Sequence, residues 1–109
     1  MAYQFGDVLL VPVIFPNATG SKNRPVLVLC ESDAVDLLVV PITTHAARGS
    51  YDVLLNDWQV AGLRLPSWAR TSKLVTVAKS TVVRKMGELT QRDAQNARAT
   101  LRRFFANIA

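Results

Sequence analysis

KNRPVLVLC, the stretch from Lys22 to Cys30, decides the fold of this 109-residue chain. It places a cationic side chain, Arg24, directly before an apolar strand. A second apolar run, LLVVPITT at residues 37–44, follows after the turn-forming residues 31–34. Two such runs separated by turn formers predict an antiparallel β-hairpin.

The register of this hairpin follows from its turn, which we centre on residues 33–34. In this register Arg24 lies opposite Thr43, with Cβ atoms about 4.5–5.5 Å apart. The same register opposes Glu31 to Asp36, an unfavourable pair of like charges unless both residues belong to the loop. A one-residue bulge would break the predicted pairing of Arg24 with Thr43.

Both faces of the hairpin are apolar. Val26, Val28 and Cys30 point one way, and Leu27 and Leu29 point the other. One face can fill the core of a barrel, whereas the other needs a cover, either a C-terminal helix or a second copy of the chain. Two strands with two apolar faces exceed what one short helix can cover, so we expect a homodimer.

Cys30 is the single cysteine, which excludes a disulfide framework and a thiol metal cluster. Its place in the apolar strand predicts a small core residue rather than a nucleophile.

The remaining sequence is a series of short strands and turns. An apolar strand at 8–15 contains Pro12, which places part of it at an edge or bulge. A polar loop at residues 16–23 follows. Further extended pieces are expected at 51–55, 62–65, 67–70 (an edge or bulged strand), 74–77 and 84–89, with a turn or helical turn at 79–82. Short strands at this spacing favour a small barrel, mainly β (α+β), of six to seven strands.

The hydrophobic period changes at the C-terminus. Thr90 matches a helix N-cap whose hydroxyl accepts from the amide of Asp93. Behind it, an apolar stripe at helical spacing contains Ala94, Ala97, Leu101, Phe104 or Phe105, and Ile108. We therefore expect one C-terminal helix and a single domain over residues 1–109.

The formal net charge of +5 and the pI near 10.0 indicate an anionic partner, of which nucleic acid is the commonest. No basic N-terminal region precedes an apolar one, and the run at residues 8–15 is too short to cross a bilayer. The cytoplasm is the expected compartment, with no membrane partner. No Gly-rich phosphate loop, CxxC, HExxH or GxSxG motif is present, so nucleotide hydrolysis, zinc chemistry and serine esterase chemistry have no support, and we expect no cofactor.

The chemistry-bearing residues that are left are Arg24, Thr43, Thr44 and His45. A fixed guanidinium can donate two hydrogen bonds to a phosphate and stabilise the charge that grows in a phosphodiester transition state. His45 is the one imidazole of the chain and a candidate general base. Trp58 and Trp68 suit either base stacking or the protein core.

At these residues the chain resembles the MazF/PemK family of toxin endoribonucleases. The matching pieces occur in the family's order along nearly the whole chain, and the ordered set is more specific than any one of them. They are GDVLLV (6–11), KNRPVLVL (22–29), VPITT (40–44), LPS (65–67) with LVTV (74–77), and MGEL (86–89) before the terminal helix.

The resemblance implies an SH3-like barrel, a homodimer, and metal-independent cleavage of single-stranded RNA at short sequences, restrained by a cognate antitoxin. The family's catalytic arginine falls on Arg24 and its catalytic threonine on Thr43, the pair that the hairpin register had aligned. The RNA contacts implied by the family fall on Ser21, Lys22, Ser72, Lys73 and Thr76. Ser72 and Lys73 replace acidic and amide residues often seen there, which bears on the cleavage sequence.

The expected reaction is attack by the ribose 2′-hydroxyl on the adjacent phosphate, with Arg24 stabilising the charge and Thr43 holding a phosphate oxygen or the hydroxyl. Two alternatives stay open. One is a non-catalytic toxin of the same fold that inhibits DNA gyrase, which uses a C-terminal aromatic and glycine where this chain has Asn107-Ile108-Ala109. The other is a degenerate module that only binds RNA or an antitoxin.

Overall fold

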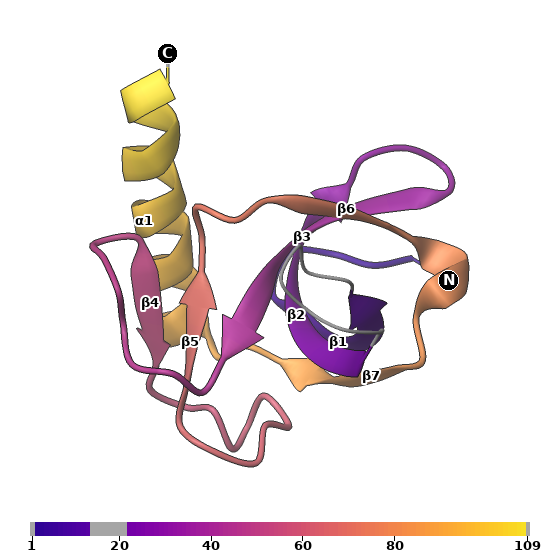
Figure 1. The fold of residues 1–109 in the computed structure, drawn as a ribbon, viewed down its shortest axis with the longest axis horizontal. Coiled ribbons are helices and arrows are strands. Elements are labelled where there is room, and N and C mark those ends of the chain that lie inside the picture. The colour runs from indigo at the N-terminus through magenta and orange to yellow at the C-terminus, as the bar shows by residue number, and fades with distance from the viewer. Residues whose placement is uncertain (1, 14–21, 109) are drawn as a thin grey trace.

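The predicted hairpin forms the centre of a curled sheet (Figure 1). The computed structural model describes residues 2–13 and 22–108. Paired strands follow the order β4-β5-β3-β2-β1-β7, with β6 also paired to β3, and each pair is antiparallel. The mainly β fold with a C-terminal helix is confirmed. Its elements are β1 (Asp7–Val13), β2 (Lys22–Glu31), β3 (Asp36–Thr43), β4 (Asp52–Leu55), β5 (Ser67–Arg70), β6 (Val75–Ala78), the 3₁₀ helix η1 (Lys79–Thr81), β7 (Arg84–Glu88) and α1 (Gln91–Ile108).

The expected register holds over the part of the hairpin away from its turn. Leu27 pairs with Val40, and Val28 pairs with Val39. Nearer the turn a bulge between Val28 and Cys30 shifts the pairing by one residue. The bulge therefore lies on the turn side of the hairpin and leaves the register toward Arg24 as expected.

The bulge also explains two differences from the expected hairpin. Glu31 pairs with Leu37 and not with Asp36, so the bulge removes the unfavourable like-charge pair that a symmetric register would have formed. Cys30 is exposed and not in the core, because the extra residue rotates it out of the alternation begun by Val26 and Val28. The carboxylate of Asp33 closes the turn by accepting from the amide of Asp36 at 2.9 Å.

Each face of β2 and β3 belongs to its own hydrophobic core. Val26 and Val28 are buried in the first core with residues of β1 and β3, and β6 packs partly buried valines against it. Leu27 is fully buried in the second core, which also contains Val40. The cover of this second core comes from β4, β5, α1 and residues 61–63 of the same chain. The apolar faces of the hairpin therefore do not by themselves require a second copy of the chain.

The structure differs from expectation at two of the predicted strands, at residues 62–65 and 67–70. β5 is not an edge strand, because it lies between β4 and β3 and pairs with both. Residues 62–65 form turns and a bend instead of an extended piece. Pro12 lies beyond the last pair of β1 with β7, so the predicted edge position of this proline is confirmed.

The 56–66 segment packs on β7 through two glycines. Gly62 has φ +85°, and a Cβ placed there would lie 2.2 Å from the carbonyl oxygen of Met86. A Cβ on Gly87 would lie 2.6 Å from the carbonyl oxygen of Ala61. Two backbones therefore touch where side chains would normally separate them, and only glycine fits.

The terminal helix begins as expected but is covered over only part of its length. The Thr90 hydroxyl accepts from the amide of Asp93 at 3.4 Å. Ala97 and Leu101 are buried and Phe104 is half-buried against the ring of Tyr51, whereas Phe105 and Ile108 are exposed, so the apolar stripe packs as far as Phe104. The last turns of α1 rise beyond the sheet (Figure 1).

We expect Gly62→Ala to destabilise the fold strongly, because a positive φ costs a residue with a Cβ roughly 1–3 kcal/mol and the new methyl meets a backbone carbonyl. Gly49→Ala is the matched control, since a Cβ there has no neighbour within 4 Å. Urea midpoints measure both. Equal midpoints for the two variants would contradict the close packing of the two backbones.

Candidate functional site

The ends of β2 and β3 diverge where their pairing stops, at Val26 and Pro41. Beyond this point β2 continues along β1, with Pro25 opposite Leu10 and Arg24 opposite Val11. β3 continues along β5 instead, with Thr43 opposite Trp68. The divergence opens a wedge between the two strand ends.

Pro25 gives a physical reason for this divergence. The carbonyl of Leu10 accepts from the amide of Val83 at 2.8 Å, so the main chain of Leu10 faces β7. Because the hydrogen-bonding direction alternates along a strand, its partner Pro25 turns its main chain toward β3. Proline has no N–H to donate there, and the ladder ends.

Arg24 and Thr43 lie on the two strands that border the wedge. By alternation Arg24 shares a face with Val26, and Thr43 shares a face with Val39; both valines belong to the first core. Arg24 is exposed and Thr43 half-buried. The two side chains therefore lie on the same face of the sheet. The predicted cross-strand pairing of Arg24 with Thr43 is not formed, because the ladder of β2 with β3 ends at Val26 and Pro41. A direct contact between the two side chains stays a prediction.

His45 lies in the exposed bend after β3. Its backbone N–H donates to Oγ1 of Thr43 at 3.1 Å, which fixes the start of the loop that carries the imidazole. Its role as general base stays a prediction.

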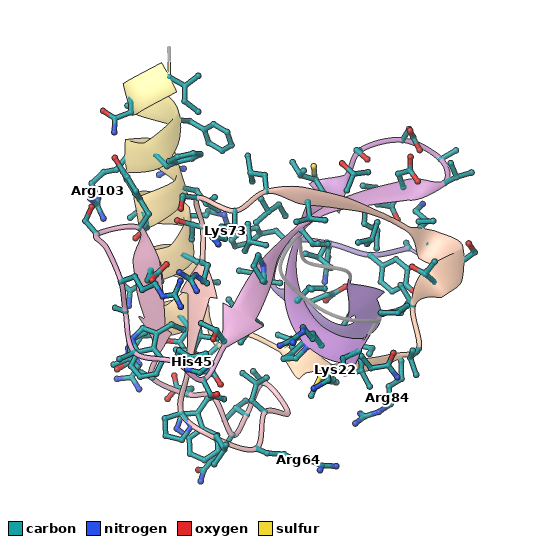
Figure 2. All side chains as sticks on the ribbon, in the orientation of Figure 1. Lys22, His45, Arg64, Lys73, Arg84 and Arg103 are labelled. Atoms are coloured by element: carbon teal, nitrogen blue, oxygen red, sulfur yellow. The ribbon has the colours of Figure 1, made fainter. Side chains whose placement is uncertain are left out.

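The other predicted RNA contacts fall into two groups. Lys22 is exposed at the start of β2, on the face of Arg24, and Ser21 lies outside the described residues. Ser72 and Lys73 are exposed in the turn after β5, and Figure 2 shows Lys73 well separated from Lys22.

Thr76 belongs with the distant group. It is exposed on β6 opposite Leu38, five residues from Thr43 along β3, and so roughly 16 Å away at ~3.3 Å per residue. Val75 and Val77 pack on the first core, so Thr76 points to the other face of the sheet. One chain does not bring Thr76 up to Thr43, or Lys73 up to Lys22.

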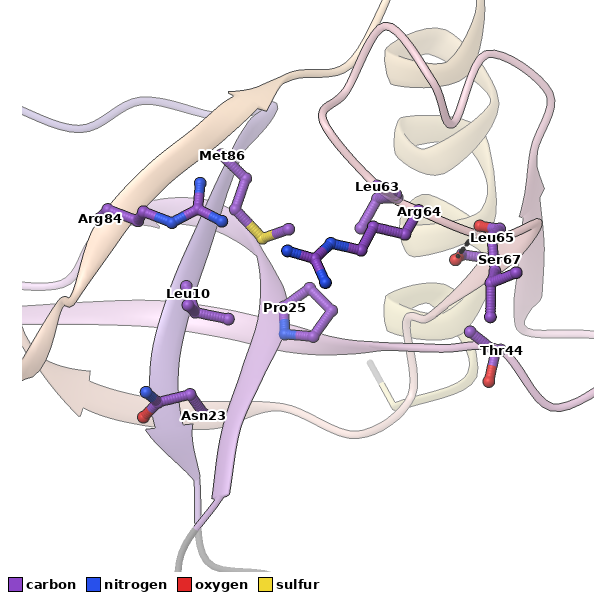
Figure 3. A pocket seen from close by; sticks show the side chains of 10 residues that line it. All are labelled: Leu10, Asn23, Pro25, Thr44, Leu63, Arg64, Leu65, Ser67, Arg84 and Met86. Carbon is purple, nitrogen blue, oxygen red and sulfur yellow. Dashed lines mark hydrogen bonds between the residues drawn. The ribbon is translucent and has the colours of Figure 1, made fainter.

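A pocket of about 330 Å³ occupies the other face of the wedge. Figure 3 shows its side chains, with the guanidinium groups of Arg64 and Arg84 both directed into it. The residues that line it come from β1, β2, β7, the residue after β3 and the 56–66 segment with the start of β5. They are Leu10, Asn23, Pro25, Thr44, Leu63, Arg64, Leu65, Ser67, Arg84 and Met86.

The sequence does not predict this pocket, because the residues that line it are scattered from position 10 to position 86. No local pattern joins Arg64 to Arg84. The available signals were Gly62 and Gly87, which hold the 56–66 segment against β7.

The wall of the pocket is anchored by a buried carboxylate. Asp93 is fully buried, and its two oxygens accept from the amides of Asn56 (2.9 Å) and Asp57 (2.8 Å). Nearer the pocket, the Ser67 hydroxyl donates to the carbonyl of Leu65 at 2.7 Å. A charge-assisted bond to a main-chain amide is stronger than a neutral one, so α1 fixes where this segment begins.

A second carboxylate, Asp57, joins the same segment to α1. The Arg92 guanidinium donates to it at 2.6 Å and the Thr90 hydroxyl at 2.6 Å. These hydrogen bonds, first from Arg92 and then from Thr90, hold the pKa of the Asp57 carboxyl below its ordinary value.

Among residues 2–13 and 22–108, no group of three or more His, Cys, Asp or Glu side chains is placed to hold a metal ion. Within the same residues no helix is long and apolar enough to span a membrane.

Comparison with solved structures defines the class of the fold. The chain is similar to the Mycobacterium tuberculosis toxin MazF-mt6, with 21% identity, a TM-score of 0.75, and coverage of 92% of this chain and 96% of that one. It is also similar to an endoribonuclease in complex with its cognate antitoxin from a mycobacterial species (16% identity, TM-score 0.79, 96% of each chain). A MazE–MazF structure from Deinococcus radiodurans matches at 14% identity, with a TM-score of 0.72 and 96% of each chain covered.

The sequence itself shows the family. The model of the PemK-like, MazF-like toxins of type II toxin–antitoxin systems matches residues 4–105. The chain therefore belongs to this family, as the ordered motifs had indicated. Comparison with curated proteins gives no match.

We expect the Asp57–Arg92 pair to stabilise the fold near neutral pH and to lose its effect in acid. A carboxyl whose pKa is lowered in the folded state contributes stability above the unfolded value of about 3.9, and this is lost as pH falls through the folded value. Arg92→Gln should lower the urea midpoint at pH 6, and the difference should shrink below about pH 4.

Arg102→Gln, on an exposed position of the same helix, is the control and should show no such pH dependence. A deficit of Arg92→Gln that is equal at both pH values would contradict the ion pair as its cause.

Proposed function

We propose that the chain is the toxin of a toxin–antitoxin pair and a metal-independent, sequence-selective endoribonuclease that cleaves single-stranded RNA. The observation that carries this proposal is that Arg24 and Thr43 lie on one face of the sheet, on the two strand ends that border the wedge. Lys22 adds a second exposed cation on the same face. Family membership supports the same class of activity.

In the proposed reaction the ribose 2′-oxygen forms a bond to the adjacent phosphorus, and the bond from phosphorus to the 5′-oxygen breaks. The Arg24 guanidinium donates to the phosphate oxygens as negative charge grows on them, which is worth most in a preorganised site. Thr43 holds a phosphate oxygen or the attacking hydroxyl.

Two proton transfers accompany the formation and cleavage of these bonds. A general base accepts the proton of the 2′-hydroxyl, and a proton is delivered to the departing 5′-oxygen. His45, whose bend is tied to Thr43, is one candidate for this base, and the proposal does not depend on it. Arginine stays protonated at neutral pH, so we assign Arg24 an electrostatic role.

We further propose a homodimer in the cytoplasm that binds a cognate antitoxin. One solved relative is described as a complex with its cognate antitoxin. A net charge of +5 suits an acidic, partly disordered antitoxin segment that folds on binding and excludes RNA.

We expect the purified chain to cut a long RNA in the presence of EDTA and to leave 2′,3′-cyclic phosphates and 5′-hydroxyls. Arg24→Ala should lower the rate roughly 10²–10³-fold, as removal of one preorganised donor does. Arg24→Lys should recover part of the rate, because a point charge lacks the bidentate fork. Mapped cuts and single-turnover rates measure both.

His45→Ala is the contrast in the same assay, and we expect it to stay within about tenfold of the unmodified chain. A loss as large as that of Arg24→Ala would make His45 the general base. A requirement for magnesium with 5′-phosphate products would overturn the mechanism. If the chain cleaves no RNA, the two remaining alternatives are a toxin that inhibits DNA gyrase and a module that only binds RNA or an antitoxin.

Light scattering at micromolar concentration should give the mass of a dimer, and the obligate interface should bury on the order of 2,000 Å². The physical reason lies in the two separated groups of predicted RNA contacts, which one chain does not join. A monomer mass at this concentration would refute the homodimer.

A further inference from the structure

The pocket on the second face of the wedge has the composition of a binding site for an anion with a flat apolar body. Its floor is apolar, with half-buried Leu10, Pro25 and Met86 beside Leu63. The exposed rim carries Arg64 and Arg84 with the polar side chains of Asn23 and Thr44. A volume of about 330 Å³ lies at the lower end of the range for small-molecule sites.

The charge in this pocket is unbalanced. Arg64 and Arg84 come from different elements and point toward one another in Figure 3. None of the described residues that line the pocket has a carboxylate. Across residues 2–13 and 22–108 neither arginine forms an ion pair, whereas Arg70 and Arg92 are paired with aspartates. Two converging guanidinium groups favour an anion with several oxygens, and a phosphate has this geometry.

The pocket and the Arg24–Thr43 pair share the same two strand ends. Asn23 and Pro25 line the pocket, and Arg24 between them faces the opposite side. Thr44 lines the pocket directly after Thr43. An RNA strand that crosses the open end of the wedge therefore reaches both sites within neighbouring nucleotides.

We propose that this pocket binds one nucleotide of the RNA next to the scissile phosphate. The phosphate lies between Arg64 and Arg84, the base rests on the apolar floor, and Asn23 and Thr44 contact its edge. A peptide carboxylate is the weaker match, because it occupies one guanidinium fork and leaves the second without a partner. The identity of the ligand as RNA rests on the proposed function.

Met86 provides a direct probe, because the chain has two methionines and the other is Met1. The protein is labelled with ¹³C-methyl methionine and titrated with a short single-stranded RNA whose 2′-hydroxyls are all methylated, so that it cannot be cut. We expect the Met86 methyl signal to shift, and Arg64→Gln and Arg84→Gln each to weaken the response. The magnitude of the slope of log K against log salt should fall by about 0.7 for each lost phosphate contact.

Two controls separate charge from position. Arg102→Gln removes a charge from α1 and should leave the Met86 shift intact, and Arg64→Lys should keep the salt slope because it keeps the charge. Urea midpoints check that each variant is folded. A Met86 signal that stays unchanged at saturating RNA, or that responds only to an acidic peptide, overturns the proposal.

Cleavage assays on the unmodified chain distinguish this failure from that of the proposed function. RNA cleavage without a Met86 response contradicts the pocket alone. A Met86 response to RNA in a chain that never cuts RNA contradicts the endoribonuclease and leaves the nucleotide pocket.

Discussion

The end of the β2–β3 ladder at Val26 and Pro41 is the constraint on which the rest of the site depends. Pro25 has no amide to extend the ladder toward β3, so β2 stays with β1 and β3 turns to β5. The separation leaves side chains accessible at the ends of β2 and β3, two strands whose middle residues are buried on both faces. A continuous ladder here would have covered the ends that carry Arg24 and Thr43.

Alternation along the two strands then divides the exposed residues by role. Along each strand, neighbouring side chains face opposite sides of the sheet. On β2 this separates Arg24 from Asn23 and Pro25, and at the end of β3 it separates Thr43 from Thr44, without any insertion or loop. The first side opens next to the core formed by Val26 and Val39, and the second next to the core of Leu27 and Val40. A substitution in the pocket therefore changes the second side without moving the guanidinium on the first.

The central hairpin, its register between Val26 and Val28, most of the later strands and the helix start could be predicted from residues close together in sequence. Apolar runs, turn formers and the Thr90 cap are local signals with direct physical meaning. The sequence indicates that a bulge is possible but does not locate it before Cys30, because its position depends on the turn that Asp33 closes. The exposure of Cys30 follows from the same bulge.

The pocket could not be predicted, because it depends on long-range contacts. Gly62 and Gly87 touch across the fold, and Asp93 binds amides 36 and 37 residues earlier in the chain. The polar character of Asp93 suggested only a helix terminus, and its buried carboxylate turned out to organise a distant turn. The separation of Lys73 and Thr76 from Arg24 also depends on how β5 and β6 share β3.

Because the pocket wall depends on Asp93, it can be completed only late in the synthesis of the chain. Arg84, Met86 and the carboxylate that anchors the 56–66 segment leave the ribosome after the central hairpin and β1 have emerged. The hairpin can pair during synthesis, but the wall of the pocket has no anchor until α1 begins to dock. A nascent chain therefore exposes Arg24 well before it has the complete surface around it, so synthesis itself delays the assembly of the finished site.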